Sequence, residues 1–178
     1  MDRVNKLPIV FLDRDGTIIV DKVYLNDPKE VEFIDGVIDG LKKLSENNFK
    51  LIIVSNQSGI ARGLVQIENL NEIHKVITET LKKHNVEIFR IYYCPHLPQD
   101  NCECRKPKTG MVKEILDFID KDKSFVIGDK ESDVEFGLAV GIKTIILSNR
   151  EISTRAHFVA RNFKEAVDFI LSSIKYEK

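Results

Sequence analysis

The chain has 178 residues and a formal net charge of −1, with 43% hydrophobic and 31% charged residues. This length fits one domain with a substantial buried core, and the composition is ordinary for a globular protein. The near-neutral charge excludes a global basic field for nucleic acid or anionic lipid, and no apolar run approaches membrane-spanning length. The first residues lack the apolar core of a signal peptide, so we expect one cytoplasmic domain over residues 1–178 without a membrane partner.

Residues 7–12 form a short apolar run that is typical of a strand buried on both faces. The run ends in Asp13 and Asp15, which Gly16 and Thr17 follow. Side chains at i and i+2 of a strand point the same way, and α/β proteins bind ligands at the carboxyl ends of parallel strands. Adjacent carboxylates repel each other unless a cation compensates them, and Mg²⁺ favours carboxylate and phosphate oxygens. The pair indicates a magnesium site; a simple Asp-Gly turn is the alternative.

The rest of the chain alternates apolar runs with segments of helical period, the pattern of a βαβ sheet. An irregular stretch over residues 16–35 is too long for a simple connection and indicates a functional flap. Asp35 is expected to cap a helix that buries Val37, Ile38, Leu41 and Leu44. Further strands are expected at Leu51–Val54, Ile88–Tyr93, Ser124–Ile127, Ile142–Leu147 and His157–Val159, and further helices over Leu64–Leu81, Thr109–Ile119, Val134–Val140 and Phe163–Ile174.

These elements predict a Rossmann-like, three-layer α/β/α fold with a central, mostly parallel sheet and no room for a large cap domain. Three histidines are given no chemistry. We expect His74 and His84 to be surface or boundary residues of their helix, and His157 to be structural.

Polar residues follow four of the expected strands. Besides the acidic pair, Ser55–Gly59 comes after the second strand, where small polar residues and a glycine let backbone N–H groups face an anion. Arg62 lies close behind this loop, and Lys106 comes after the third strand. Asp129 and Asp133 follow the fourth. Because the carboxyl ends of parallel strands share one edge, these residues favour a single phosphate-handling site.

All three cysteines lie between Cys94 and Cys104, so no distant partner exists for a disulfide. Cys94, His96, Cys102 and Cys104 form a ligand set that matches a closed tetrahedral Zn²⁺ site. Buried unligated cysteines are the alternative. The loop has little apolar content, so a structural zinc would replace the missing core and position Arg105 and the lysine after it.

With these motifs in place, the chain resembles the haloacid dehalogenase superfamily of phosphotransferases. Asp13-x-Asp15-Gly16-Thr17 is similar to its motif I, Ser55 to motif II, Lys106 to motif III and Gly128-Asp129-x-x-x-Asp133 to motif IV. Segments 55–63, 92–96 and 104–107 make the chain similar to the D-glycero-D-manno-heptose 1,7-bisphosphate 7-phosphatases, with the histidinol phosphatases as near relatives. The resemblance covers nearly the whole chain.

The resemblance implies a Mg²⁺-dependent phosphoric monoester hydrolase. Asp13 would attack phosphorus and form an aspartyl-phosphate, while Asp15 would protonate the leaving sugar oxygen and then activate water. Mg²⁺ would be held by the Asp13 carboxylate, the Asp15 backbone carbonyl and Asp129. Ser55 and Lys106 would hold the oxygens of the transferring phosphoryl group, whose transfer depends mainly on positioning and charge neutralisation.

The expected substrate is a small phosphosugar bound at an open rim. Arg105 would pair with the second phosphate of a bisphosphate, because a guanidinium fork matches phosphate oxygens. Asp133 would support the site from behind. The residues expected to contact substrate come from the flap, from the loop after the second strand and from motifs III and IV: Asp21, Lys22, Tyr24, Ser55, Asn56, Gln57, Ser58, Arg62, Arg105, Lys106 and Lys130.

Four functions stay open from the sequence. The first is a heptose bisphosphate phosphatase that feeds nucleotide-activated heptose and surface glycan synthesis. The cysteine loop is short, a length more typical of histidinol phosphatases, so histidinol phosphate is the second candidate substrate. Nucleic-acid 3′-phosphatases share the Asp-x-Asp-Gly-Thr strand, although the near-neutral charge weighs against them. A non-catalytic phosphate-binding module is the fourth. A monomer is the default expectation, since no heptad seam is identifiable.

Overall fold

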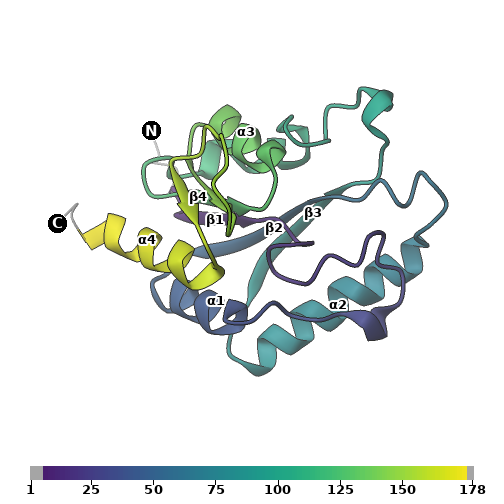
Figure 1. The fold of residues 1–178 in the computed structure, drawn as a ribbon, viewed down its shortest axis with the longest axis horizontal. Helices are drawn as coiled ribbons and strands as arrows, with labels where there is room; N and C mark the ends of the chain where they lie inside the picture. The colour runs from purple at the N-terminus through teal and green to yellow at the C-terminus, as the bar shows by residue number, and fades with distance from the viewer. Residues whose placement is uncertain (1–5, 176–178) are drawn as a thin grey trace.

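A computed structural model describes residues 6–175 as an α/β structure built on one sheet of six strands (Figure 1). The strand order is β3-β2-β1-β4-β5-β6, and every described pairing is parallel. This is the order of a doubly wound fold, so the predicted Rossmann-like architecture is confirmed. The strands are β1 (Ile9–Leu12), β2 (Lys50–Asn56), β3 (Ile88–Cys94), β4 (Phe125–Gly128), β5 (Lys143–Leu147) and β6 (Phe158–Ala160).

Helices cover both faces of the sheet (Figure 1). They are α1 (Val37–Glu46), α2 (Ile67–Lys83), α3 (Glu131–Val140) and α4 (Phe163–Lys175), with 3₁₀ segments η1 (Pro28–Glu30), η2 (Pro98–Asp100) and η3 (Gly110–Phe118). Side chains from α1, α2 and α4 pack in one core cluster, and those from α3 and η3 in the other. Alternate residues of a strand serve the two faces. In β1, Val10 and Leu12 join the first cluster while Ile9 and Phe11 join the second, which explains the unbroken apolar run.

Helix α3 lies unusually close to the sheet. A Cβ atom at Gly137 would lie 2.4 Å from the Val126 side chain and 2.5 Å from that of Thr144, so only glycine fits there. Phe136 beside it packs edge-on against Phe11, with ring centroids 5.6 Å apart. This close packing fixes the amino end of α3 directly beyond the carboxyl end of β4, where motif IV lies.

Three details of the predicted elements are wrong. Helix α1 begins after Gly36, which has a left-handed backbone and no side-chain cap, so Asp35 does not cap it. Helix α2 begins at Ile67 rather than Leu64, because Gln66 has an extended backbone and precedes the first turn. The expected helix after Thr109 is the 3₁₀ segment η3, in which Val112 alone is buried.

The segment expected to be a flap is anchored at its base and exposed at its tip. Ile18, Ile19 and Leu25 are fully buried, and Ile19 bridges to Phe33. The tip carries Val23, which is 73% exposed and has a left-handed backbone. Over the residues that the structure describes, no helix is both long enough and apolar enough to cross a membrane.

Candidate active site

The acidic pair lies where the order of the sheet reverses. The neighbours of β1 are β2 on one side and β4 on the other, so the chain leaves β1 at the switch point of a doubly wound sheet. Such a point opens a crevice beyond the strand ends that commonly holds the ligand. Asp13 is the first residue past β1; its backbone N–H donates to the Ile127 carbonyl at 3.0 Å, and its side chain is buried.

The ammonium group of Lys106 is the centre of this crevice. It donates to Asp13 Oδ1 at 2.8 Å, to Asp133 Oδ1 at 2.6 Å and to the Val54 carbonyl at 2.7 Å, so all three of its protons are used. Burial alone lowers the pKa of Lys106, but attraction to Asp13 and Asp133 raises it above its ordinary value. The lysine therefore stays charged although it is only 3% exposed.

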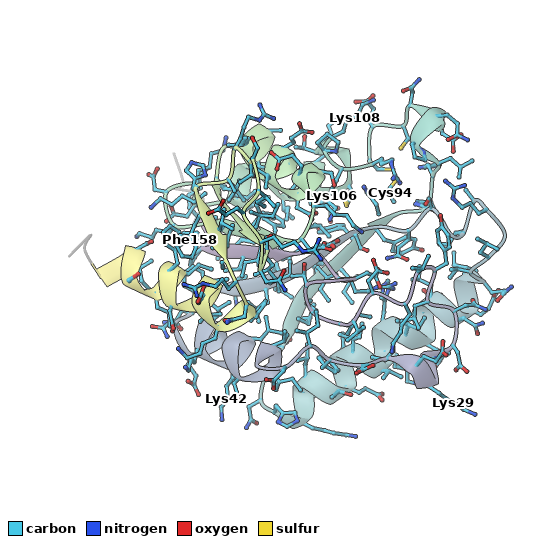
Figure 2. The ribbon with its side chains drawn as sticks, in the orientation of Figure 1. Lys29, Lys42, Cys94, Lys106, Lys108 and Phe158 are labelled. Atoms are coloured by element: carbon cyan, nitrogen blue, oxygen red, sulfur yellow. The ribbon has the colours of Figure 1, made fainter. Side chains whose placement is uncertain are left out.

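Asn56 holds the main chain of Lys106 in place. Its side-chain amide donates to the Lys106 carbonyl at 3.1 Å and its amide oxygen accepts from the Lys106 N–H at 2.9 Å. Asn56 is paired with Cys94 across β2 and β3, so this contact ties the cysteine loop to the sheet edge. Figure 2 labels Lys106 and Cys94, which lie near each other in that view.

Three carboxylates converge beside this one buried ammonium. Oxygens of Asp13, Asp129 and Asp133 all lie within 4.8 Å of one another. Both oxygens of Asp133 are occupied, Oδ1 by Lys106 and Oδ2 by the N–H of Lys130 at 3.1 Å. Burial, followed by repulsion from Asp13, raises the pKa of Asp133 to about 6. The cluster thus carries more negative than positive charge.

Asp129 is the member of the cluster with an unpartnered carboxylate oxygen. Its Oδ1 is buried and has no hydrogen-bond partner. Burial first, and then repulsion from Asp13, raises the pKa of Asp129 to about 7. Gly16 has a left-handed backbone, and a Cβ atom there would lie 2.3 Å from Asp129 Oδ2, so glycine is required for the carboxylate to lie this close to the turn. A buried oxygen-only set with excess negative charge fits a hard divalent cation, which Asp13 and Asp129 would hold.

Asp15 belongs to a second, adjoining cluster. Both of its oxygens accept from the buried guanidinium of Arg14, from Nη2 at 3.0 Å and from Nε at 3.1 Å. The Gln57 amide donates to Asp15 at 2.8 Å and to Ser55 Oγ at 2.5 Å, while its oxygen accepts from Arg14 at 3.1 Å. Ser55 and Asp15, from different strand ends, are therefore linked through one glutamine.

The residues expected at the rim have mixed surroundings. Lys130 lies 3.8 Å from Asp21, which brings the flap next to motif IV. Lys22 instead pairs with Glu32 at 2.6 Å, inside the flap. The guanidinium of Arg62 lies 5.8 Å from the centre of the Tyr24 ring, which joins the flap tip to the loop after β2. Ser58 is half-buried in that loop.

The cysteines and His96 form a compact cluster at the end of β3. Cys94 Sγ lies 3.0 Å from Cys104 and 3.5 Å from Cys102, and His96 Nδ1 lies 3.2 Å from Cys104. Ligands of a tetrahedral Zn²⁺ ion with Zn–S bonds of about 2.3 Å lie roughly 3.7 Å apart, so these separations suit a shared metal after a small expansion. Arg105 beside the cluster donates to the His96 carbonyl at 3.3 Å.

Three residues of the two clusters were not predicted. Arg14 is 1% exposed and His74, expected near the surface, is 9% exposed and lies 3.4 Å from Arg14. The signal for His74 was present, because Leu70, His74 and Ile77 share one face of α2 at helical spacing. Thr17 is fully buried, and its hydroxyl has no partner within the described part of the chain. His157 is structural as predicted: Nδ1 accepts from the Thr144 N–H at 3.1 Å.

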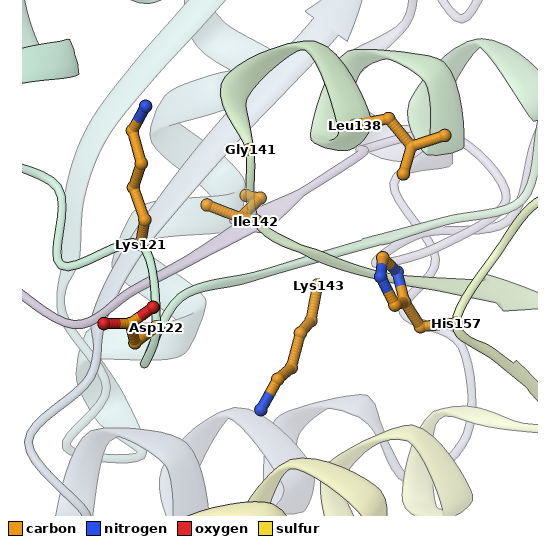
Figure 3. A pocket seen from close by; sticks show the side chains of 7 residues that line it. All are labelled: Lys121, Asp122, Leu138, Gly141, Ile142, Lys143 and His157. Carbon is orange, nitrogen blue, oxygen red and sulfur yellow. The ribbon is translucent and has the colours of Figure 1, made fainter.

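A separate hollow of about 440 Å³ lies at the other end of the strands, beside the amino ends of β4 and β5 (Figure 3). Gly141, Ile142 and Lys121 line it, and they precede β5 and β4 in the chain. Asp122 is the one carboxylate among the described residues that line this hollow. The acidic and basic side chains that converge on one another therefore lie at the carboxyl ends of the strands and not in this hollow.

A buried lysine between acidic residues at the switch point of a parallel sheet defines the haloacid dehalogenase class of phosphatases. Comparison with known families agrees: a model described as polynucleotide kinase 3 phosphatase matches residues 8–134, and one described as HAD-hydrolase-like matches residues 103–175. The chain belongs to this superfamily and, within it, to the family of the heptose 1,7-bisphosphate 7-phosphatases, on the identities that follow.

The chain is similar along nearly its whole length to named relatives. It is 37% identical to D-glycero-beta-D-manno-heptose-1,7-bisphosphate 7-phosphatase of Escherichia coli, over 96% of this chain and 91% of that one. It is 39% identical to the corresponding alpha-anomer enzyme of Campylobacter jejuni, over 92% and 96%. A crystal structure of D,D-heptose 1,7-bisphosphate phosphatase from B. bronchiseptica, complexed with magnesium and phosphate, matches with a TM-score of 0.81 and 26% identity, over 93% and 99%.

The raised pKa of Asp129 predicts that cation binding displaces a proton. The carboxylate must ionise to bind a divalent cation, so the affinity should rise with pH up to about 7, where the group titrates, and level off above it. Below that pH we expect a change of about tenfold per pH unit for one displaced proton. Titration calorimetry with Mg²⁺ from pH 5.5 to 8, in buffers of different ionisation enthalpy, measures both the affinity and the proton release.

The raised pKa of Asp129 also makes the stability of the folded protein depend on pH. A carboxyl group whose pKa is raised on folding stabilises the cation-free protein at low pH and loses this contribution as the pH rises towards about 7. Added Mg²⁺ should therefore raise the melting temperature more at pH 8 than at pH 5.5. Asp129→Asn should weaken both pH dependences and leave the part that Asp133 contributes through its own raised pKa of about 6, and a pH-independent Mg²⁺ affinity in the unmodified protein would contradict the assignment.

Proposed function

We propose that this protein is a phosphoric monoester hydrolase that removes the 7-phosphate of D-glycero-D-manno-heptose 1,7-bisphosphate. The observation that carries the proposal is the buried Lys106 ammonium between Asp13 and Asp133, beside the unpartnered oxygen of Asp129. In this arrangement Asp13 is a fixed nucleophile, Lys106 is a fixed cation, and the free oxygen of Asp129 would bind a second cation. The substrate follows from whole-length similarity to relatives that are named for it.

In the proposed reaction, Asp13 attacks phosphorus in line and forms an aspartyl-phosphate. Asp15 gives a proton to the leaving sugar oxygen and then takes one from the water that hydrolyses the intermediate. Ser55 and Lys106 hold equatorial oxygens of the transferring group. Asp13, Asp129 and the Asp15 backbone carbonyl would hold Mg²⁺, which would supply the remaining charge neutralisation.

The proposed surroundings of the sugar are the flap, the loop after β2 and the cysteine loop. Arg105 and Lys130 are the cations proposed for the second phosphate, because Lys22 is held by Glu32 at 2.6 Å, whereas Lys130 lies 3.8 Å from Asp21. Tyr24 and Arg62, whose side chains contact each other, border the same opening. We further propose a single cytoplasmic domain over residues 1–178, monomeric, with Zn²⁺ as a structural metal at the four residues around Cys94.

A nucleic-acid 3′-phosphatase is the second candidate, because a family model of that description matches residues 8–134. Two observations favour the heptose substrate instead. The similarity to the heptose phosphatases extends over 96% of this chain, and the net charge of −1 offers little attraction to a polyanion. Histidinol phosphate, suggested by the short cysteine loop, has less support, because the relatives named above act on heptose bisphosphates.

A phosphate-release panel tests the substrate. The panel comprises both anomers of heptose 1,7-bisphosphate, histidinol phosphate and a 3′-phosphorylated oligonucleotide, each with and without Mg²⁺. We expect kcat/KM for one heptose anomer to exceed that for histidinol phosphate and for the oligonucleotide by at least about 10²-fold, since a site built around a polar substrate discriminates strongly against ligands that leave its polar groups unpaired. Preference for the oligonucleotide or for histidinol phosphate would reject the proposed substrate while keeping the phosphatase class.

Asp13→Asn tests the covalent mechanism. Asparagine keeps the volume of the side chain but cannot attack phosphorus, so turnover should fall by at least about 10³-fold while the protein still folds. Steady-state phosphate release and thermal unfolding measure the two effects. Asp117→Asn, at an exposed carboxylate outside the site, is the matched control and should retain full activity. Near-normal turnover of Asp13→Asn would exclude Asp13 as the nucleophile.

Zinc removal tests the role of the cysteine cluster. Cys102→Ser removes one ligand, so we expect loss of bound zinc by elemental analysis, a melting temperature lower by about 5 °C or more, and reduced kcat, because Lys106 follows the cluster directly. Glu103→Gln alters an exposed residue of the same loop and should change none of these. A zinc-free variant with unchanged melting temperature and activity would separate the loop from catalysis.

A further inference from the structure

His74 is a buried polar residue that the proposed chemistry does not use. It comes from α2, the helix that follows the loop after β2, and its Nε2 atom lies 3.4 Å from Nη1 of Arg14. Its ring also lies against Tyr93, with ring centroids 5.8 Å apart. A polar side chain this deep in the structure normally has a defined partner, and the partner of His74 is the guanidinium.

The donor and the acceptor of the contact between Arg14 and His74 can be assigned. Burial and the positive charge of Arg14 lower the pKa of His74 to about 4, so the imidazole is neutral near pH 7. An arginine has donors only and does not lose its proton in proteins. The Nε2 atom therefore faces Arg14 with its lone pair and accepts, while the proton of the neutral ring is on Nδ1.

Arg14 is consequently fixed along its whole guanidinium group. Nε and Nη2 bind the two oxygens of Asp15, and Nη2 also binds Gln57. The remaining nitrogen, Nη1, faces His74. Without an acceptor at this position, one end of a fully buried guanidinium would lose its partner and the group could rotate. Such rotation would move the carboxylate that it holds.

We propose that His74 is a positioning residue for proton transfer, which fixes the Asp15 carboxylate through Arg14. The inference rests on the proposed function, in which Asp15 protonates the leaving oxygen and then activates water. Proton transfer requires the acid within hydrogen-bond reach of that oxygen, and misplacement by about 1 Å can cost as much as 10²-fold in rate. His74 touches neither substrate nor Asp15. Arg14 binds Asp15 directly but reaches Ser55 only through Gln57, so we expect the main effect of His74 on the steps that use this proton.

Two substrates with different leaving groups provide the test. A sugar alkoxide needs a proton as it leaves, whereas p-nitrophenolate leaves without one. His74→Leu removes the acceptor and keeps an apolar side chain. We expect kcat/KM for heptose bisphosphate to fall by about 10- to 100-fold and kcat/KM for p-nitrophenyl phosphate to stay within about twofold. Rapid-quench experiments with the second substrate should detect accumulated phosphoenzyme, because its hydrolysis also needs Asp15.

Two further variants make the test specific. His74→Gln places an amide oxygen where it can accept from Arg14 and should recover most of the lost rate. His84→Leu, at an exposed histidine just beyond the same helix, should leave both substrates unaffected. If His74→Leu does not fold, His74→Asn keeps a polar side chain that is too short to reach Arg14 and carries the same expectation.

The outcomes separate this inference from the proposed function. An equal fall of kcat/KM for both substrates, or no fall for either, would overturn the positioning role of His74. Failure of the unmodified protein to act on heptose bisphosphate would instead overturn the proposed substrate. In that case the ratio measured between p-nitrophenyl phosphate and an alkyl phosphate that the protein does hydrolyse still tests His74.

Discussion

The pairing of the Lys106 ammonium with Asp13 and Asp133 is the interaction on which the site depends. A buried charge is tolerated only with close, hydrogen-bonded partners, and removing one partner leaves an uncompensated charge in a low-dielectric surrounding. Lys106 follows the cysteine loop, Asp13 follows β1 and Asp133 lies in α3, so one ammonium joins three separate segments of the chain. The close packing of α3 on the sheet at Gly137 and the Asn56 contacts to the Lys106 backbone both serve to keep these partners together.

Asp13 and Asp15 lie beyond the end of β1, where the chain turns at Gly16, and so these two neighbouring carboxylates acquire different surroundings. Asp13 faces a lysine that neutralises part of its charge and leaves Asp129 short of a counterion. Asp15, two residues further along the chain, accepts hydrogen bonds from the guanidinium of Arg14 and the amide of Gln57. Separate counterions allow one group to act as a nucleophile and the other to handle protons, which is the general way in which paired acids take different roles.

Much of this could be predicted from the sequence, and the failures have physical reasons. The order of the apolar runs and the polar residues after them were sufficient to predict a parallel sheet with its site at the carboxyl ends of the strands. The Cys94–Cys104 spacing was sufficient to predict that the three cysteines and His96 lie together in one cluster that could hold a metal ion. Arg14 was missed because a charged residue between two acids suggests solvent exposure until the tertiary packing is known. His74 was missed although its helical spacing with Leu70 and Ile77 places it on the buried face of α2. The start of α2 was misplaced because Leu64 and Ile67 continue its apolar period while lying at the exposed rim.

Substrate specificity is expected in the two loops that lie outside the core of the protein. The core clusters are complete on both faces of the sheet without help from the flap tip or the cysteine loop, whose exposed residues include Val23, Tyr24 and His96. These loops therefore contribute little to the core and are free to differ according to the substrate. The cysteine loop is constrained in one respect: Lys106 must reach Asp13 directly after the last cysteine. A metal would rigidify a loop that has little apolar content to bury, and it would couple the order of this loop to the charge at the centre of the site.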